Sequence, residues 1–154
     1  ECEAASEPTF RAVFEALVRH KVSLEHIVLK PSMVINGKSC SEKASVKDVA
    51  EATLRVLRRT VPAAVPTINF LSGGQSSEQA TAHLNAMNQQ KLPWNLSFSY
   101  ARALQDDCMK IWKGQASNVA AAQAAFYKRA KLNSLASCGK YQESMENTSS
   151  SAVA

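Results

Sequence analysis

Three short apolar stretches of this sequence each lead into residue types that could carry out chemistry. They are "HIVLK" at 26–30, which ends in Lys30, "TINFL" at 67–71, which leads into Ser72 and Gly73, and "NLSFSY" at 95–100, which leads into Arg102. A lysine is an amine nucleophile when its neutral form is populated. Glycine-rich turns before helices and arginine side chains both bind anions such as phosphate. The combination indicates amine chemistry on an anionic substrate.

Each of these residues also has an ordinary structural explanation. Lysine is mostly exposed in proteins, so Lys30 taken alone is a solvated residue where a strand reaches the surface. The sequence SGGQ that begins at Ser72 can be a simple tight turn, since glycine tolerates the dihedral angles of such a turn. Arg102 is less ordinary, because a cation in the first turn of a helix faces the positive end of the helix dipole. An anion held between the turn and Arg102 would remove that repulsion.

The elements that must position these residues alternate between strands and helices. Helices are expected over 7–20 with Pro8 in the first turn, from Ser45 to Thr60 with Asp48 completing an approximate capping box, over 76–88, over 101–114, and from Ser117 or Asn118 to Gly139. Strands that alternate with helices predict right-handed crossovers and a parallel sheet. The carboxyl ends of its strands share one edge, which is where α/β proteins bind ligands.

Composition and length indicate one soluble globular domain. The 154 residues are 45% hydrophobic and 20% charged, and no apolar run approaches the ~18 residues of a membrane span. The first residues do not resemble a secretory signal. We therefore expect a cytoplasmic protein, with an organelle left open because a removed transit segment would leave no trace. Four widely spaced cysteines predict free thiols, and the three histidines lack metal-ligand spacing.

The net charge of +5 raises the question of polyanion binding. The basic residues are spread along the chain, and the one compact cluster is "RVLRR" with Arg55, Arg58 and Arg59. On a helix these three side chains fall on one face. A solvated helix face explains them better than a nucleic-acid surface.

Several longer motifs resemble a known family. They are "LKPSMV", "RRTVPAAVP", "FLSGGQSSEQATAHLNAMN", "PWNLSFSYARALQ" and "AKLNSLASCGKY". Together, over about residues 2–141, they resemble the C-terminal half of class I fructose-1,6-bisphosphate aldolase, with bacterial and plastid members most similar. The resemblance implies that residues 1–141 are about strands 6–8, with their helices, of a TIM (β/α)8 barrel with a C-terminal helix. Residues 142–154 would be a flexible polar tail.

The resemblance also implies roles for the strand-end residues. Lys30 matches the Schiff-base lysine of this lyase family, and Ser72, Gly73 and Arg102 match residues that bind the C1 phosphate of the sugar. The implied reaction is the reversible cleavage of fructose 1,6-bisphosphate in glycolysis and gluconeogenesis, without a metal or other cofactor. The implied partners are a sugar phosphate and either further copies of the chain or a complex that supplies the missing barrel half. No nucleic-acid or membrane partner is implied.

The sequence departs from the family in ways that leave alternatives open. The family's acid and base carboxylates and its second lysine lie on earlier strands, and the chain ends in "SSSAVA" where the family usually ends in a tyrosine. Glu25, the carboxylate nearest to Lys30, would lie at the wrong end of its strand. The chain is therefore part of a working aldolase, a catalytically inactive half-barrel that serves as a structural subunit, or an unrelated α/β phosphate-binding module.

Overall fold

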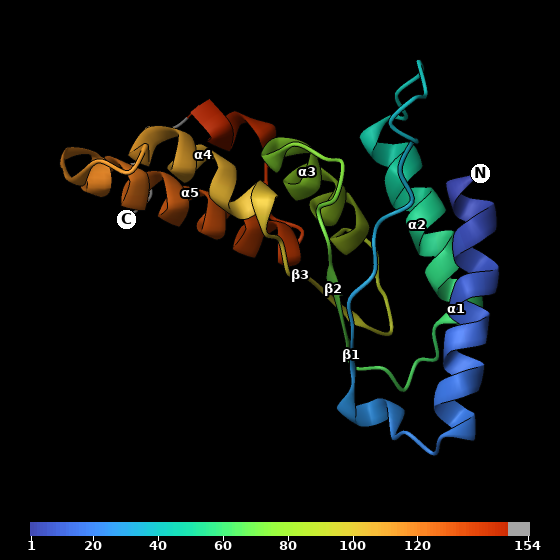
Figure 1. Cartoon of the computed structure of the whole chain (residues 1–154). Helices are drawn as coiled ribbons and strands as arrows, with labels where there is room; N and C mark the ends of the chain where they lie inside the picture. The colour runs from blue at the N-terminus through green and yellow to red at the C-terminus, as the bar shows by residue number, and fades with distance from the viewer. Residues whose placement is uncertain (148–154) are drawn as a thin grey trace.

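A three-stranded parallel sheet connects the two groups of helices in this chain (Figure 1). In the computed structural model, which describes residues 1–147, the strands are β1 (Val28–Leu29), β2 (Thr67–Phe70) and β3 (Asn95–Phe98), in the order β1-β2-β3. The register pairs Leu29 with Ile68, and Ile68 with Leu96. Helices connect successive strands, so the predicted α/β architecture with a parallel sheet is confirmed.

Five α-helices accompany the sheet within the described residues. They are α1 (Cys2–Arg19), α2 (Val46–Thr60), α3 (Ser77–Asn88), α4 (Arg102–Trp112) and α5 (Val119–Ser137). Three 3-10 helices also occur, namely η1 (Leu24–His26), η2 (Ala116–Asn118) and η3 (Glu143–Asn147). Helix α1 packs on α2 and α2 on α3, while α5 packs against both α3 and α4 (Figure 1). None of the helices within residues 1–147 has the length and apolar character needed to cross a membrane.

The first helix differs most from its expected boundaries. It begins at Cys2, so Pro8 lies inside α1 and not in its first turn. Proline lacks an N–H group and interrupts helical hydrogen bonding there. The turns of α1 that precede the expected start are stabilised by contacts with α2. Glu3 forms an ion pair with Arg55 at 2.5 Å, and Glu7 forms one with Arg59 at 3.2 Å. These two arginines of the basic cluster therefore have intramolecular partners.

Helices cover one face of the sheet. Ile68 and Phe70 of β2 are completely buried against them, whereas Thr67 and Asn69, which alternate with them, are partly exposed. Successive strand residues point to opposite faces. Val28 of β1, in register with Thr67, is 58% exposed. The face that carries Val28, Thr67 and Asn69 is thus open to solvent within residues 1–147.

The end of the described chain folds back onto the helices. The flexible tail was expected over residues 142–154, but residues 143–147 form η3. Glu146 of this turn pairs with the buried Arg129 of α5 at 2.7 Å, an interaction that the polar composition of the segment does not reveal. The remainder of the expected tail, residues 148–154, lies outside the described residues.

Candidate functional site

The structure brings the carboxyl ends of the three strands to one edge. The Leu71 N–H donates to the Pro31 carbonyl, and the Ser99 N–H donates to the Phe70 carbonyl, both at 2.9 Å. These bonds continue the strand register beyond β1, β2 and β3. Lys30 directly precedes Pro31 and Ser72 directly follows Leu71, so the two residues emerge at neighbouring points of the same edge.

Lys30 lies on the open face of the sheet. The register places it opposite Asn69, one position beyond the pair of Leu29 with Ile68. Lys30 is exposed within residues 1–147. The Asn69 Oδ1 atom is buried and has no hydrogen-bond partner among the described residues. A lysine and an unpaired amide oxygen therefore occupy adjacent strands on the face opposite the helices.

The glycine turn before α3 presents unpaired backbone donors. The Gln75 N–H closes the turn on the Ser72 carbonyl at 3.2 Å, and Gly74 has φ +86°, which favours glycine. The Gly73 and Gly74 N–H groups donate to no acceptor within residues 1–147. An added Cβ at Gly73 would meet nothing within 4 Å, so there is open space beside this residue. Unpaired N–H groups at a helix start form an anion site.

The turn is anchored from behind by a glutamine and a histidine. Gln75 Nε2 lies 2.7 Å from His83 Nδ1 and 3.2 Å from the Met33 sulfur. An amide nitrogen only donates, so His83 Nδ1 accepts and the neutral ring carries its proton on Nε2. Burial lowers the pKa of His83 to about 4. Sequence spacing did not identify this contact, because His83 looked like one of three unconnected histidines.

Arg102 is the first residue of α4 and is exposed. The N-cap residue Ala101 provides no side-chain hydrogen bond, and the first turn contains no acidic residue. The positive end of this helix is therefore left without a negative side chain. Tyr100, two residues earlier, is buried, and its hydroxyl donates to the Ala80 carbonyl of α3 at 3.0 Å. This bond ties the end of β3 to the helix that follows the glycine turn.

Glu25 does not join the strand-end residues. It lies in η1, before the amino end of β1, where Ser23 Oγ donates to its carboxylate at 3.0 Å. A backbone hydrogen bond and then the Ser23 hydroxyl lower the pKa of Glu25. The edge that carries Lys30 is at the other end of the strand. Glu25 is therefore a surface carboxylate and not a partner for Lys30.

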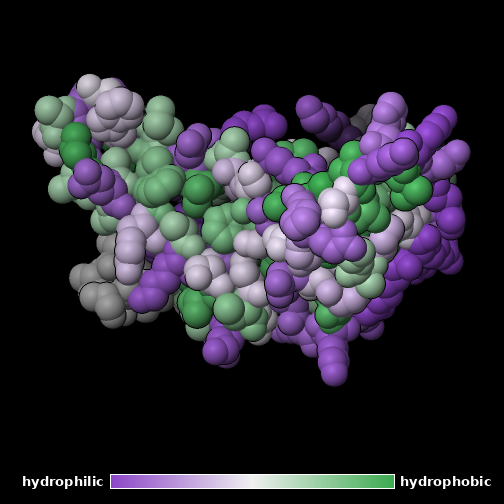
Figure 2. Space-filling view, turned by 90° about the horizontal axis from the view of Figure 1, so that it is seen from below, coloured by the Kyte–Doolittle hydropathy of each residue, from purple (hydrophilic) through white to green (hydrophobic). Residues whose placement is uncertain are grey.

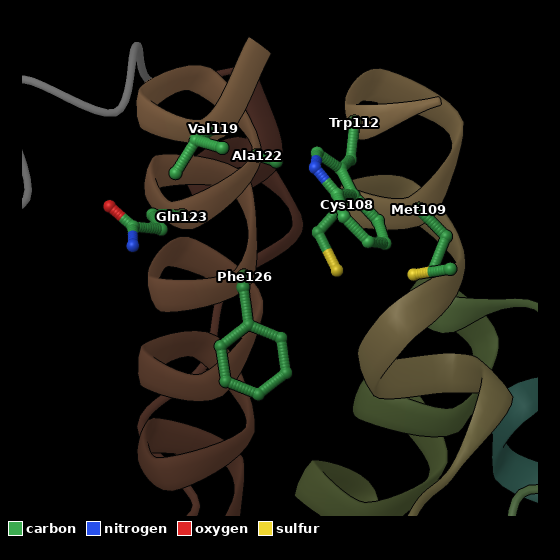
Figure 3. A pocket seen from close by; sticks show the side chains of 7 residues that line it. All are labelled: Cys108, Met109, Trp112, Val119, Ala122, Gln123 and Phe126. Carbon is green, nitrogen blue, oxygen red and sulfur yellow. The ribbon is translucent and has the colours of Figure 1, made fainter. Parts of the chain in front are cut away.

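A separate apolar groove runs between α4 and α5 (Figure 3). Its lining consists of Cys108, Met109 and Trp112 from α4 and Val119, Ala122, Gln123 and Phe126 from α5. No charged side chain contributes to it. Apolar surface is also widespread in the middle and left of the view from below (Figure 2). The groove contains none of the strand-end residues, and all four cysteines of the chain, including Cys108, are free thiols as expected.

Comparisons with known proteins agree on one family. The sequence model of "Fructose-bisphosphate aldolase class-I" matches residues 1–154. A probable fructose-bisphosphate aldolase class 1 of Xanthomonas axonopodis pv. citri is 53% identical over 92% of this chain and 43% of its own length. A chloroplastic aldolase of Chlamydomonas reinhardtii is 52% identical over 94% of this chain and 38% of its own length. Aldolase B of Sparus aurata is also 53% identical. Bacterial and plastid members are thus among the most similar relatives, as expected, together with an animal one.

A solved structure gives the same result for the fold. The fructose-bisphosphate aldolase of Plasmodium falciparum, solved in complex with TRAP and a small-molecule inhibitor, superposes with a TM-score of 0.89 and 46% identity. The match covers 92% of this chain and 41% of that protein. The chain therefore spans about two fifths of the length of the relatives that it matches.

Proposed function

The chain belongs to the class-I fructose-bisphosphate aldolase family, and from this we propose that it is the C-terminal part of a Schiff-base aldolase. The whole protein would cleave fructose 1,6-bisphosphate reversibly into dihydroxyacetone phosphate and glyceraldehyde 3-phosphate. The observation that carries this proposal is the common edge of Lys30, the turn at Ser72 and Gly73, and the start of α4 at Arg102. An amine and two anion-binding elements at one edge suit a phosphorylated ketone.

The three strands would be about strands 6–8 of a (β/α)8 barrel. Their parallel order, with helices on one face only, fits a segment of such a barrel. The rest of the barrel would pair with the outer edges of β1 and β3 and would cover the open face that carries Lys30. We propose that this part comes from further residues of the same polypeptide or from another subunit. It would also supply the acid and base groups.

Lys30 would act as the nucleophile. Its neutral amine attacks the C2 ketone of the open-chain sugar, and loss of water gives a protonated imine. The imine accepts the electron pair of the C3–C4 bond as this bond breaks and the C4 hydroxyl loses its proton, which releases glyceraldehyde 3-phosphate. Protonation of the remaining enamine at C3, followed by hydrolysis, frees dihydroxyacetone phosphate and regenerates Lys30.

The glycine turn and Arg102 would hold the phosphate on C1. The unpaired N–H groups of Gly73 and Gly74 lie in the turn just before α3, and Arg102 adds a guanidinium at the start of α4. Both helix dipoles favour an anion between these starts. Binding energy from the phosphate would orient C2 toward Lys30, which raises the effective concentration of the reacting groups.

Reductive trapping on the intact native protein tests this function. Borohydride in the presence of dihydroxyacetone phosphate should reduce the imine and leave one stable adduct on Lys30, detected by peptide mass spectrometry. Lys30→Met should abolish the adduct. Lys91→Met is the matched control, because Lys91 is an exposed lysine beyond the carboxyl end of α3, and its removal should not affect trapping.

A negative result would support the inactive alternative. If the native protein folds and assembles but Lys30 forms no adduct, the chain is a structural aldolase-derived subunit and the enzymatic proposal is refuted. The intact mass of the native polypeptide, measured on the same sample, shows whether further residues of the barrel are covalently attached to this segment.

A further inference from the structure

A buried arginine of α5 contacts two helices, the one that follows the glycine turn and the one that begins with Arg102. The side chain of Arg129 is only 5% exposed. Its Nη2 atom lies 3.4 Å from Glu78 Oε1 in the first turn of α3 and 3.7 Å from Asp107 Oδ2 of α4. Glu78 follows Ser72 by six residues, and Asp107 follows Arg102 by five residues. One guanidinium thus bridges the helix after the glycine turn and the helix that begins with Arg102.

A second contact of Arg129 reaches the backbone at the start of α3. Its Nη1 atom donates to the Thr81 hydroxyl at 3.2 Å. The Thr81 oxygen lies 2.8 Å from both the Ser77 carbonyl and Asn133 Oδ1, and its single proton serves one of them at a time. Thr81 and Asn133 are completely buried. The guanidinium is therefore linked to the first residue of α3 through a hydroxyl that water does not reach.

The strongest partner of Arg129 comes from the C-terminal turn η3. Glu146 accepts two hydrogen bonds from the guanidinium, at 2.7 and 3.0 Å, in a bidentate arrangement. The Tyr141 hydroxyl donates to the same carboxylate at 3.0 Å, and the Lys128 ammonium donates to the Glu146 carbonyl. Burial, and then the bond to Glu146, raises the pKa of Tyr141. Glu146 is therefore the anion that compensates a buried cation, which would otherwise be costly.

From these contacts we infer that Arg129 is a positioning residue for the phosphate site, and that Glu146 fixes Arg129 in place. The role rests on the proposed aldolase function. A helix transmits displacement over one or two turns, so the guanidinium sets the separation between the glycine turn and Arg102. Without Glu146, Arg129 would keep only the longer ion pairs with Glu78 and Asp107 and the hydrogen bond to Thr81. The glycine turn and Arg102 would then be held less firmly at the separation that a phosphate needs, and the affinity for a phosphorylated ketone would fall.

The alternative is that the cluster contributes only to stability, and two ketones separate the two roles. The half-saturating concentration for borohydride trapping on Lys30 is measured in the intact protein with dihydroxyacetone phosphate and with dihydroxyacetone. Glu146→Gln and Asp107→Asn each remove one charge at nearly constant side-chain shape, and neither substitutes Arg129 itself. We expect a rise of about two- to tenfold for the phosphorylated ketone and none for dihydroxyacetone. Glu3→Gln, which breaks the ion pair with Arg55 between α1 and α2, should change neither value.

Amide hydrogen exchange supplies a readout that does not depend on catalysis. In Glu146→Gln, peptides that cover residues 72–78 and 101–107 should exchange faster than in the wild-type protein, with the Glu3→Gln protein as reference. Equal half-saturation with dihydroxyacetone phosphate, or an equal rise for both ketones, would overturn the positioning role. If wild-type Lys30 forms no adduct, the proposed function fails, and unchanged exchange at the two segments then also refutes the positional link.

Discussion

Acidification should weaken the glycine turn through His83. This histidine accepts the hydrogen bond from Gln75 that anchors the turn at 2.7 Å, and it can do so only while Nδ1 is unprotonated. The side chain is 6% exposed, and burial lowers its pKa from 6.5 to about 4. Protonation would place a charge in the core and turn the acceptor of Gln75 into a second donor.

The sign and size of the effect follow from proton binding. Between pH 6.5 and 4 the unfolded chain binds a proton at His83 and the folded chain does not. The free energy of unfolding therefore falls as the pH drops below about 6.5, and the loss levels off below about 4. From pH 7 to pH 5 this single group lowers the free energy of unfolding by at most about 2 kcal/mol. Any solvent that reaches the His83 ring makes this loss of free energy smaller.

Urea unfolding at a series of pH values between 7 and 5 measures this contribution. His83→Asn is the informative variant, because its amide oxygen can still accept from Gln75 but does not titrate. Its stability should fall less than that of the wild-type protein over this interval. His20→Asn, a change at an exposed histidine, should retain the wild-type pH dependence. If the wild-type and His83→Asn curves run parallel from pH 7 to 5, His83 is not held neutral by burial.

Three further predictions concern the end of α5, the start of α3 and the proposed phosphate site. Gly139 has φ +67°, and a Cβ there would lie 2.8 Å from the Asn88 carbonyl oxygen at the end of α3. Gly139→Ala should therefore lower the free energy of unfolding, measured by urea titration, by about 2–4 kcal/mol. Gly37→Ala is the control and should change this free energy by less than about 0.5 kcal/mol, because an added Cβ at Gly37 meets nothing within 4 Å. Ser76→Ala removes the N-cap of α3 and should cost about 1 kcal/mol by urea unfolding. Arg102→Met should raise the half-saturating concentration of dihydroxyacetone phosphate in borohydride trapping by about tenfold or more, and an unchanged value would remove Arg102 from the phosphate site.

Local sequence signals predicted the helices near the site well. The pairing of Ser45 with Asp48 is a capping box in the structure, and α2 begins at the next residue. Gly139 has the positive φ expected of a glycine that ends a helix. Caps and helix ends depend on neighbours in the chain, so a sequence displays them directly. The order of strands and helices was likewise sufficient to predict a parallel sheet.

Local sequence patterns did not predict the features that depend on contacts with residues far along the chain. Pro8 suggested a helix start, yet α1 begins at Cys2 because carboxylates of its first turns pair with arginines of α2. Strand β1 is shorter than the apolar run, since His26 belongs to a 3-10 helix. The contacts of Arg129 with Thr81 and Glu78 join residues 48 and 51 positions apart, and no spacing within one segment indicates them. Contacts between segments that are distant in the sequence become visible only in the folded structure.

The exposure of Lys30 bears on where its reactivity would arise. A lysine favours its neutral form when burial or nearby cations disfavour the charge. Within residues 1–147 this lysine lies on an open sheet face in contact with water, and Asn69 beside it has an unpaired amide oxygen. The same face would be enclosed by the remaining strands of a barrel, which would desolvate the amine and bring polar groups to both side chains. The proposed nucleophile therefore depends on segments that cover this face, whereas the glycine turn and the start of α4, which would hold the phosphate in the proposed function, both lie within the described residues.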